Sequence, residues 1–255
     1  MVLLDDNFAS IVNAIEEGRA VFENIRKFLT YILAHNVPEL IPYLGFALFA
    51  IPLALTPVQI LSIDMATDSL TALGLGIERP DPQVMQRPPR SQHERLFDGS
   101  LALRAYLCLG LIEAVASMAA FFFVLNGGGW KYGHHLATYD PLYLQATTAC
   151  LSAIVVMQIV NVFLCRSNIR SVVSIKLLSN RLIVFGVLLE VALILLIDYS
   201  DWGNSLLGTA PIDKKVWLFV LPFAVGLLIL EEFRKWFVRV WLFNRVTRRK
   251  PGAGG

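Results

Sequence analysis

The chain has 255 residues, of which 56% are hydrophobic and 16% are charged, and its mean hydropathy is +0.59. A soluble domain of this length carries about a quarter charged residues. The composition therefore excludes an ordinary soluble domain and predicts a lipid bilayer as the surroundings of the chain. The formal net charge is +2, and we expect no nucleic-acid partner.

Six apolar stretches follow one another along the chain. A helix crosses the roughly 30 Å hydrocarbon layer with about 20 mainly apolar residues. The stretches cover residues 28–50, 57–77, 101–125, 142–164, 182–199 and 216–230. Residues 51–56, with Pro52, are a link short enough to make the first two spans a helical hairpin. The predicted fold is an all-α, polytopic membrane bundle of six transmembrane helices within residues 28–243, preceded by residues 1–27 and followed by a basic tail at 244–255.

The basic residues fall almost entirely on one side of the predicted spans. Nineteen of the 22 lysines and arginines precede the first span, lie in or beside the connections after the second and fourth, or follow the sixth. Lys131, Lys214 and Lys215 lie on the other side. Because cytoplasmic loops retain positive charge, we expect a multi-pass protein of the plasma membrane with both termini in the cytoplasm.

The first span contains polar groups that lipid disfavours. A carboxylate in the middle of a membrane helix costs about 2.5–3.5 kcal/mol on insertion scales, so it indicates a function. His35, Asn36 and Glu39 lie in this span with Pro38 between the last two. Asn36 and Glu39 are three residues apart and are expected to share a helix face. Pro38 is expected to open the helix and free carbonyl oxygens for a cation.

The second span contributes Asp64, Thr67 and Asp68. Asp64 and Asp68 are four residues apart, which predicts one shared face, and the hairpin brings this face to the depth of Glu39. Three carboxylates, an amide and a hydroxyl form an oxygen-rich set suited to hard cations such as Na⁺, K⁺ or Ca²⁺. The alternative is that these groups only hydrogen-bond one helix to another.

Later spans add weaker candidates. Gln158 and Asn161 lie three residues apart in the fourth span, and they serve either as interhelical hydrogen-bonding groups or as ligands. Glu190 in the fifth span and Glu113 in the third are isolated acids. Each is either a residue of an ion or proton path or a partner of a neighbouring helix.

Several of these segments resemble type II P-type cation-transporting ATPases. The motifs that carry the resemblance are MVLLDDNFASIVNAIEEGR (1–19), NVPEL (36–40), DMATD (64–68), RPDPQVMQRPPR (79–90) and LEEFRKWFVR (230–239). The resemblance covers essentially the whole chain and implies that its six spans correspond to helices five to ten of the family. Residues 1–27 would be the end of the phosphorylation domain and the cytoplasmic stalk. Among family members, the motifs are most similar to those of sodium/potassium and proton/potassium pumps.

The resemblance also implies roles for individual residues. Carried over position by position, the cation ligands would be Asn36, Glu39, Asp64, Thr67 and Asp68, with contributions from Gln158, Asn161 and Glu190. His35 departs from the family, because sodium/potassium pumps have Ser and proton/potassium pumps have Lys at this position. An imidazole changes charge in the physiological range, so His35, with Glu113 as a further candidate, is a hypothetical proton-coupling residue. Unchanged pH dependence of transport in a pump carrying His35→Ser would exclude this role.

The sequence contains no DKTGT, TGES or GDGxND motif. The resemblance therefore implies that ATP and Mg²⁺ act only through domains outside this sequence, and we expect no ATP hydrolysis by this chain alone. The expected partner is the N-terminal part of a P-type ATPase. The predicted function is that of the cation-binding and translocating membrane domain of an ATP-driven pump. Two alternatives remain: a non-catalytic membrane protein that associates with or regulates a full-length pump, and a transporter driven by an ion gradient.

Overall fold

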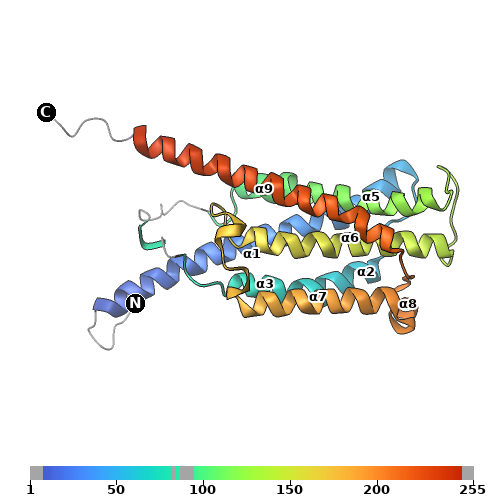
Figure 1. Ribbon diagram of the computed structural model, residues 1–255, viewed down its shortest axis with the longest axis horizontal. Coiled ribbons are helices and arrows are strands. Elements are labelled where there is room, and N and C mark those ends of the chain that lie inside the picture. Colours follow the sequence, from blue (N-terminus) through green and yellow to red (C-terminus); the bar gives the residue numbers. More distant parts are fainter. Residues whose placement is uncertain (1–7, 82–83, 87–94, 249–255) are drawn as a thin grey trace.

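The computed structural model describes residues 8–81, 84–86 and 95–248, and within these residues the regular structure is entirely helical. The principal helices run side by side along the long axis of the molecule (Figure 1). In chain order they are α1 (Phe8–Phe49), α2 (Pro57–Ser62), η1 (Ile63–Asp68), α3 (Ser69–Gly76), α4 (Gly99–Ala102), η3 (Leu103–Gly110), α5 (Leu111–Gly127), α6 (Pro141–Cys165), α7 (Arg181–Tyr199), α8 (Asp201–Leu207) and α9 (Lys214–Arg248). The connections contain the short 3₁₀ turns η2 (Val84–Gln86), η4 (Val172–Ser174) and η5 (Leu177–Ser179).

The predicted fold class is confirmed. Five helices in the described part of the chain are long and apolar enough to cross a membrane: Phe8–Phe49, Gly99–Gly127, Pro141–Cys165, Arg181–Tyr199 and Lys214–Trp241. The remaining predicted span, which is the second in chain order at residues 57–77, is present as the consecutive helical segments α2, η1 and α3. It does not count among the five, and its centre contains Asp64 and Asp68 within a π-helical segment.

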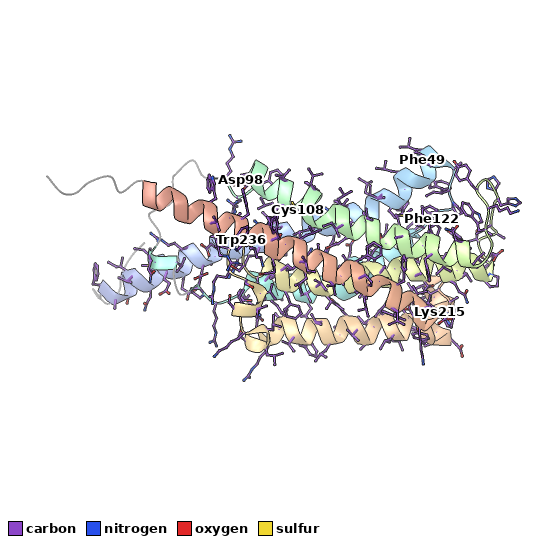
Figure 2. The ribbon with its side chains drawn as sticks, turned by 45° about the horizontal axis from the view of Figure 1, so that its top comes forward. Phe49, Asp98, Cys108, Phe122, Lys215 and Trp236 are labelled. Atoms are coloured by element: carbon purple, nitrogen blue, oxygen red, sulfur yellow. The ribbon has the colours of Figure 1, made fainter. Side chains whose placement is uncertain are left out.

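Helix α6 lies at the centre of the bundle, with α1, α5, α7 and α9 packed around it. Figure 1 shows the start of α1 and the end of α9 at the same end of the molecule. The loops after α3 and α6 lie there too, and we refer to this end as the basic end. Figure 2 shows Asp98 and Trp236 toward the basic end, and Phe49 and Lys215 toward the opposite end. Lys215 is one of the three basic residues expected on the opposite side.

Side-chain caps fix the starts of several helices. Thr56 and Gln59 form a reciprocal capping box at the start of α2. Asp140 accepts a hydrogen bond from the backbone at the start of α6, where Pro141 occupies the first turn. Asn180 caps α7 in the same way. Such caps satisfy backbone N–H groups that have no partner inside the helix.

The prediction of a helix opened at Pro38 is wrong, because α1 continues through both Pro38 and Pro42. Proline cannot donate to the carbonyl four residues earlier, which here belongs to Ala34. Gly110 packs against this carbonyl, and a Cβ at Gly110 would lie 2.6 Å from its oxygen. The irregular helical segments lie instead in the second and third spans, where η1 and η3 are π-helices.

Helices α3 and α7 approach each other closely at two glycines. A Cβ added at Gly74 would lie 2.6 Å from the Ile183 side chain, and one added at Gly186 would lie 2.7 Å from Cγ2 of Thr71. Larger residues at these positions would force the helices apart, because well-packed interiors leave little room for added atoms. The two glycines therefore set the distance between Thr71 and the face of α7.

Buried ion pairs join η3 to α9 near the basic end. Nη2 of Arg104 lies 2.7 Å from Oε1 of Glu231, and Nε of Arg234 lies 2.7 Å from Oε2 of the same carboxylate. Arg104 and Glu231 are both buried. We refer to Arg104, Glu231 and Arg234 as the charged clamp.

A second contact holds the loop before α4 against α1. Nη2 of Arg26 lies 2.9 Å from Oδ2 of Asp98. Burial acts to raise the pKa of Asp98. The opposing effect is larger and comes from hydrogen bonds donated by the Leu101 backbone N–H, Arg26 and Ser100, and from the charge of Arg26. The pKa of Asp98 is therefore below its ordinary value. The contact therefore favours the ionised carboxylate.

Candidate functional site

The candidate site is centred on a contact between α1 and η1. Nδ1 of His35 lies 2.8 Å from Oδ2 of Asp68. Both residues are buried, with exposed fractions of 1% for His35 and 7% for Asp68. The hairpin thus brings the polar groups of the first two predicted spans together, as its short link predicts.

Two amides on α6 close the site from a third helix. Nε2 of Gln158 donates to Oδ2 of Asp68 at 3.2 Å, and Nδ2 of Asn161 lies 3.3 Å from Nε2 of His35. Gln158 and Asn161 are fully buried. The structure therefore places both predicted α6 residues against the α1–η1 pair.

Tyr31 and Thr71 extend the site toward α7. The Tyr31 hydroxyl donates to Oδ1 of Asp68 at 3.3 Å and lies 3.0 Å from the Thr71 hydroxyl oxygen. The Thr71 hydroxyl donates to Oε1 of Glu190 at 2.9 Å. The two hydroxyl groups thus lie between Asp68 and Glu190. Neither hydroxyl residue is among the predicted site residues, although each lies one helical turn from one of them.

Glu113 enters the site from α5. Its Oε2 lies 3.8 Å from Nε2 of His35, and its side chain is fully buried. We refer to the whole group as the central cluster, and it comprises Tyr31, His35, Asp68, Thr71, Glu113, Gln158, Asn161 and Glu190.

Several buried oxygens in and beside the central cluster have no hydrogen-bond partner among the described residues. They are Oε1 of Glu39, both carboxylate oxygens of Glu113, Oε1 of Gln158 and Oε2 of Glu190. Buried polar atoms in native proteins almost always have a partner, from protein, water or a bound ion. These acceptors therefore have the capacity to bind a proton, a water molecule or a cation.

Three other predicted ligands lie outside the central cluster. Asn36 and Asp64 are exposed on the bundle, and Glu39 is half-buried beside Asp64. The Thr67 side chain lies outside the described part of the chain. Within the described residues, no group of three or more His, Cys, Asp and Glu side chains is arranged to hold a metal ion. The structure therefore brings together only part of the predicted ligand set.

A bundle of apolar helices that encloses several ionisable side chains is typical of membrane proteins with a functional site inside the bilayer, ion transporters among them. The family model described as "Cation transporting ATPase, C-terminus" matches residues 52–237. This chain belongs to that family and is a membrane domain of the cation-pump type.

Curated relatives agree with the family match. The chain is 32% identical to the sodium/potassium-transporting ATPase subunit alpha-4 of Rattus norvegicus, over 99% of this chain and 26% of that protein. It is 32% identical to the sodium/potassium-transporting ATPase subunit alpha of Drosophila melanogaster, over 94% of this chain and 25% of that protein. It is 29% identical to the potassium-transporting ATPase alpha chain 2 of Oryctolagus cuniculus, over 94% and 24% respectively. The chain thus spans about a quarter of the length of these relatives.

Proposed function

We propose that this chain binds cations at its central cluster and passes them across the membrane as the transport domain of an ATP-driven pump. The observation that carries the proposal is the set of buried carboxylate oxygens without partners at Glu39, Glu113 and Glu190. A soluble or structural helix bundle gains nothing from such groups, because each costs free energy unless it binds something.

The charge balance of the central cluster favours a cation. Three carboxylic acids, Asp68, Glu113 and Glu190, surround a single imidazole, that of His35. Carboxylates in a low-dielectric interior repel each other strongly, and a bound cation removes that repulsion. The available ligands are all oxygens except the imidazole, which favours Na⁺, K⁺ or Ca²⁺ over soft metals.

The exposed polar residues beside the central cluster support an interaction with further helices. Asn36 on α1 and Asp64 on η1 are exposed at the depth of the cluster, where contact with lipid is costly. Helices from the N-terminal part of a pump would cover this face and add the rest of the ligands. ATP and Mg²⁺ would act in that part of the protein, and α1, which extends beyond the bundle at the basic end, would carry the resulting movement to His35.

The distribution of charge supports an orientation with the basic end in the cytoplasm. Arg79, Arg166 and Arg181 lie in or directly beside the loops at this end, and positively charged loops are retained on the cytoplasmic side. Both termini would then be cytoplasmic, and the plasma membrane is the proposed location. Single cysteines placed at exposed Ser100 and Tyr139 test the orientation, because only the latter should react with an impermeant reagent added outside cells.

Cation binding is testable on the purified chain in nanodiscs. We expect Na⁺, K⁺ or Ca²⁺ to raise its unfolding temperature, because a ligand of the folded state stabilises it. Asp68→Asn should abolish this ion-dependent rise.

The matched control is Asp198→Asn. Asp198 is a buried acid on α7 that lies outside the central cluster. Its Oδ2 accepts a hydrogen bond from Ser152 at 2.7 Å, and its Oδ1, like the oxygens of Glu113, has no hydrogen-bond partner among the described residues. Its variant should keep the ion-dependent rise. A rise that is absent from the unmodified chain, or that both variants lose equally, would contradict cation binding at the central cluster.

A further inference from the structure

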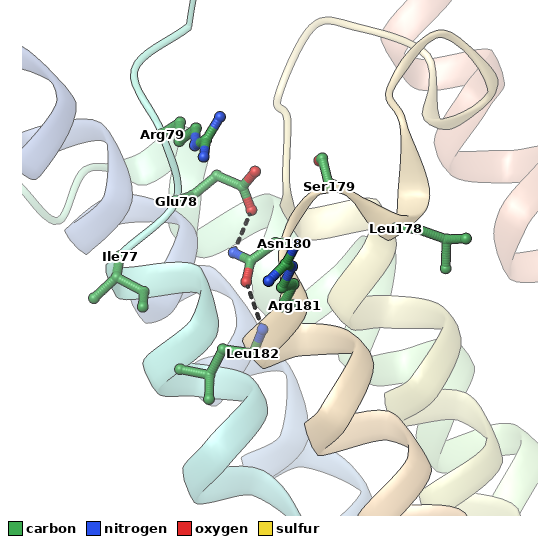
Figure 3. Close-up of a pocket in the computed structure, with 8 residues that line it drawn as sticks. All are labelled: Ile77, Glu78, Arg79, Leu178, Ser179, Asn180, Arg181 and Leu182. Atoms are coloured by element: carbon green, nitrogen blue, oxygen red, sulfur yellow. Dashed lines mark hydrogen bonds between the residues drawn. The ribbon is translucent and has the colours of Figure 1, made fainter.

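A cavity of about 740 Å³ opens at the basic end between the end of α3 and the start of α7. Figure 3 shows the residues that line it: Ile77, Glu78, Arg79, Leu178, Ser179, Asn180, Arg181 and Leu182. Its volume lies in the range of about 300–1,000 Å³ that is typical of small-molecule sites. The cavity is separate from the central cluster and shares no residue with it.

The acidic group in the cavity wall is already neutralised. Glu78 accepts hydrogen bonds from Nη2 of Arg166 at 2.7 Å and from Nε of Arg166 at 3.1 Å. Nδ2 of Asn180 donates to the same carboxylate at 2.9 Å, as the dashed line in Figure 3 shows. Arg166 is itself buried. The carboxylate therefore contributes no net charge to the cavity.

Two arginines supply the net charge of the cavity. Arg79 lies on the chain leaving α3, Arg181 lies in the first turn of α7, and both are exposed. Neither guanidinium group forms a hydrogen bond or an ion pair with another residue in the part of the chain that the structure describes. A guanidinium group binds phosphate oxygens through two parallel hydrogen bonds. The cavity thus offers two unoccupied phosphate-binding groups.

An exposed apolar surface continues from the cavity into the membrane part of the bundle. Ile77 and Leu178 at the cavity are 62% and 77% exposed. Leu73 lies one turn before Ile77 on α3, Phe185 lies one turn after Arg181 on α7, and these two side chains are 54% and 59% exposed. A basic cavity above an apolar surface matches the two parts of a phospholipid, a charged headgroup and acyl chains.

We propose that this cavity binds the headgroup of an anionic phospholipid through Arg79 and Arg181. The acyl chains lie over Leu73 and Phe185. The cavity is at the end of the bundle with the excess of basic residues, and anionic lipids are concentrated in the cytoplasmic leaflet. A soluble phosphate compound would use the two arginines but would gain nothing from the apolar surface. The lipid is therefore the occupant that both features favour.

Lipid binding is measured on the purified chain in nanodiscs that contain phosphatidylcholine with or without phosphatidylglycerol. Native mass spectrometry of the chain released from each nanodisc counts the lipids that remain bound. We expect retained phosphatidylglycerol on the unmodified chain and a loss of about fivefold in relative affinity for each arginine replaced, in Arg79→Gln and Arg181→Gln. Both side chains are exposed, so the variants should fold.

The double variant with Arg170→Gln and Arg239→Gln is the control for the double variant with Arg79→Gln and Arg181→Gln, because it removes the same two charges at the same end but outside the cavity. It should retain phosphatidylglycerol as the unmodified chain does. If the control loses as much phosphatidylglycerol as the cavity variants, the lipid is held by general attraction to the basic surface. If the unmodified chain retains phosphatidylcholine and phosphatidylglycerol equally, the cavity does not recognise the headgroup. Displacement of the lipid by millimolar inorganic phosphate would assign the cavity to a free phosphate compound. Each of these results would overturn the proposal.

Discussion

The central cluster and the charged clamp are both buried in the same helix bundle, but they satisfy their charges in opposite ways. In the clamp, both oxygens of Glu231 accept hydrogen bonds from Arg104 or Arg234 at 2.7–3.0 Å. In the central cluster, both carboxylate oxygens of Glu113 lack a partner among the described residues. A carboxylate surrounded by arginines holds helices together, whereas one left with free oxygens is available to a ligand. The two regions therefore contrast a structural use of charge in the clamp with the binding use that we propose for the central cluster.

The largest expected effect comes from breaking the charged clamp with Glu231→Gln. Removing this carboxylate leaves the Arg104 guanidinium buried without a counter-charge, and the loss of one partner of a buried pair costs about 3–5 kcal/mol. The free energy of unfolding, measured in mixed micelles with increasing dodecyl sulfate, should fall by that amount. The ion-dependent part of the stability should be unchanged. Loss of the ion-dependent part would show that the clamp and the central cluster are not separate in function.

Glu113→Gln should weaken cation binding without lowering the stability of the ion-free chain. The amide keeps the size of the side chain and removes a buried carboxylate whose oxygens accept no hydrogen bond from the described residues, so stability without ions should be equal or higher. Cation affinity should fall by about 30-fold, which corresponds to about 2 kcal/mol, because a charged ligand is lost from a buried site. Ion titrations monitored by unfolding temperature measure both quantities. Unchanged affinity would remove Glu113 from the binding site.

A smaller effect is expected from Gly186→Ala, which tests the close approach of α3 and α7. The added Cβ would lie 2.7 Å from Cγ2 of Thr71, so α7 must shift and the hydrogen bond from Thr71 to Glu190 should weaken. Overpacking of this kind costs about 1–3 kcal/mol. Gly226→Ala in α9 is the control, since its Cβ would meet nothing within 4 Å. This control should be neutral or slightly stabilising, and equal destabilisation by both would show that helix packing at Gly186 is not special.

The smallest effect concerns the contact between Arg26 and Asp98 at the edge of the bundle. The pKa of Asp98 is lowered in the folded state, so its contribution to stability is present above the ordinary aspartate pKa and is lost as the pH falls through the lowered value. The side chain is 38% exposed, and solvent screening keeps this contribution below about 1 kcal/mol. Unfolding measured between pH 6 and pH 3 should show a slightly smaller loss in Asp98→Asn than in the unmodified chain. An identical pH dependence would mean that the contact does not stabilise the fold.

The sequence predicts the bundle well because burial in lipid imposes a simple requirement on composition. The fourth and fifth spans, expected at residues 142–164 and 182–199, are observed as Pro141–Cys165 and Arg181–Tyr199. A membrane span must be apolar along its whole length, so its ends can be read from where polar residues begin. The π-helical segments η1 and η3 in the second and third spans were not predicted, because they depend on backbone geometry.

The site was predicted less completely. Ionisable residues in apolar spans are conspicuous, and His35, Asp68, Glu113 and Glu190 were all found for this reason. Tyr31 and Thr71 were not, because hydroxyl residues are common in membrane helices and only contacts show their role. Asp64 and Asp68 were expected to contribute together to the site, but Asp64 is exposed while Asp68 is buried. Both lie in the π-helical η1, and which of the two the neighbouring helices cover depends on how the bundle packs, which a spacing of four residues does not reveal.

The π-helical segment η1 has a consequence for how ion choice could change during evolution. Of its two aspartates, Asp68 is buried against the Gln158 amide on α6, and Asp64 is exposed. Under the proposed function, a helix from the rest of the pump would add ligands beside Asp64. Ion choice could then change through that helix, without altering the interior of this bundle.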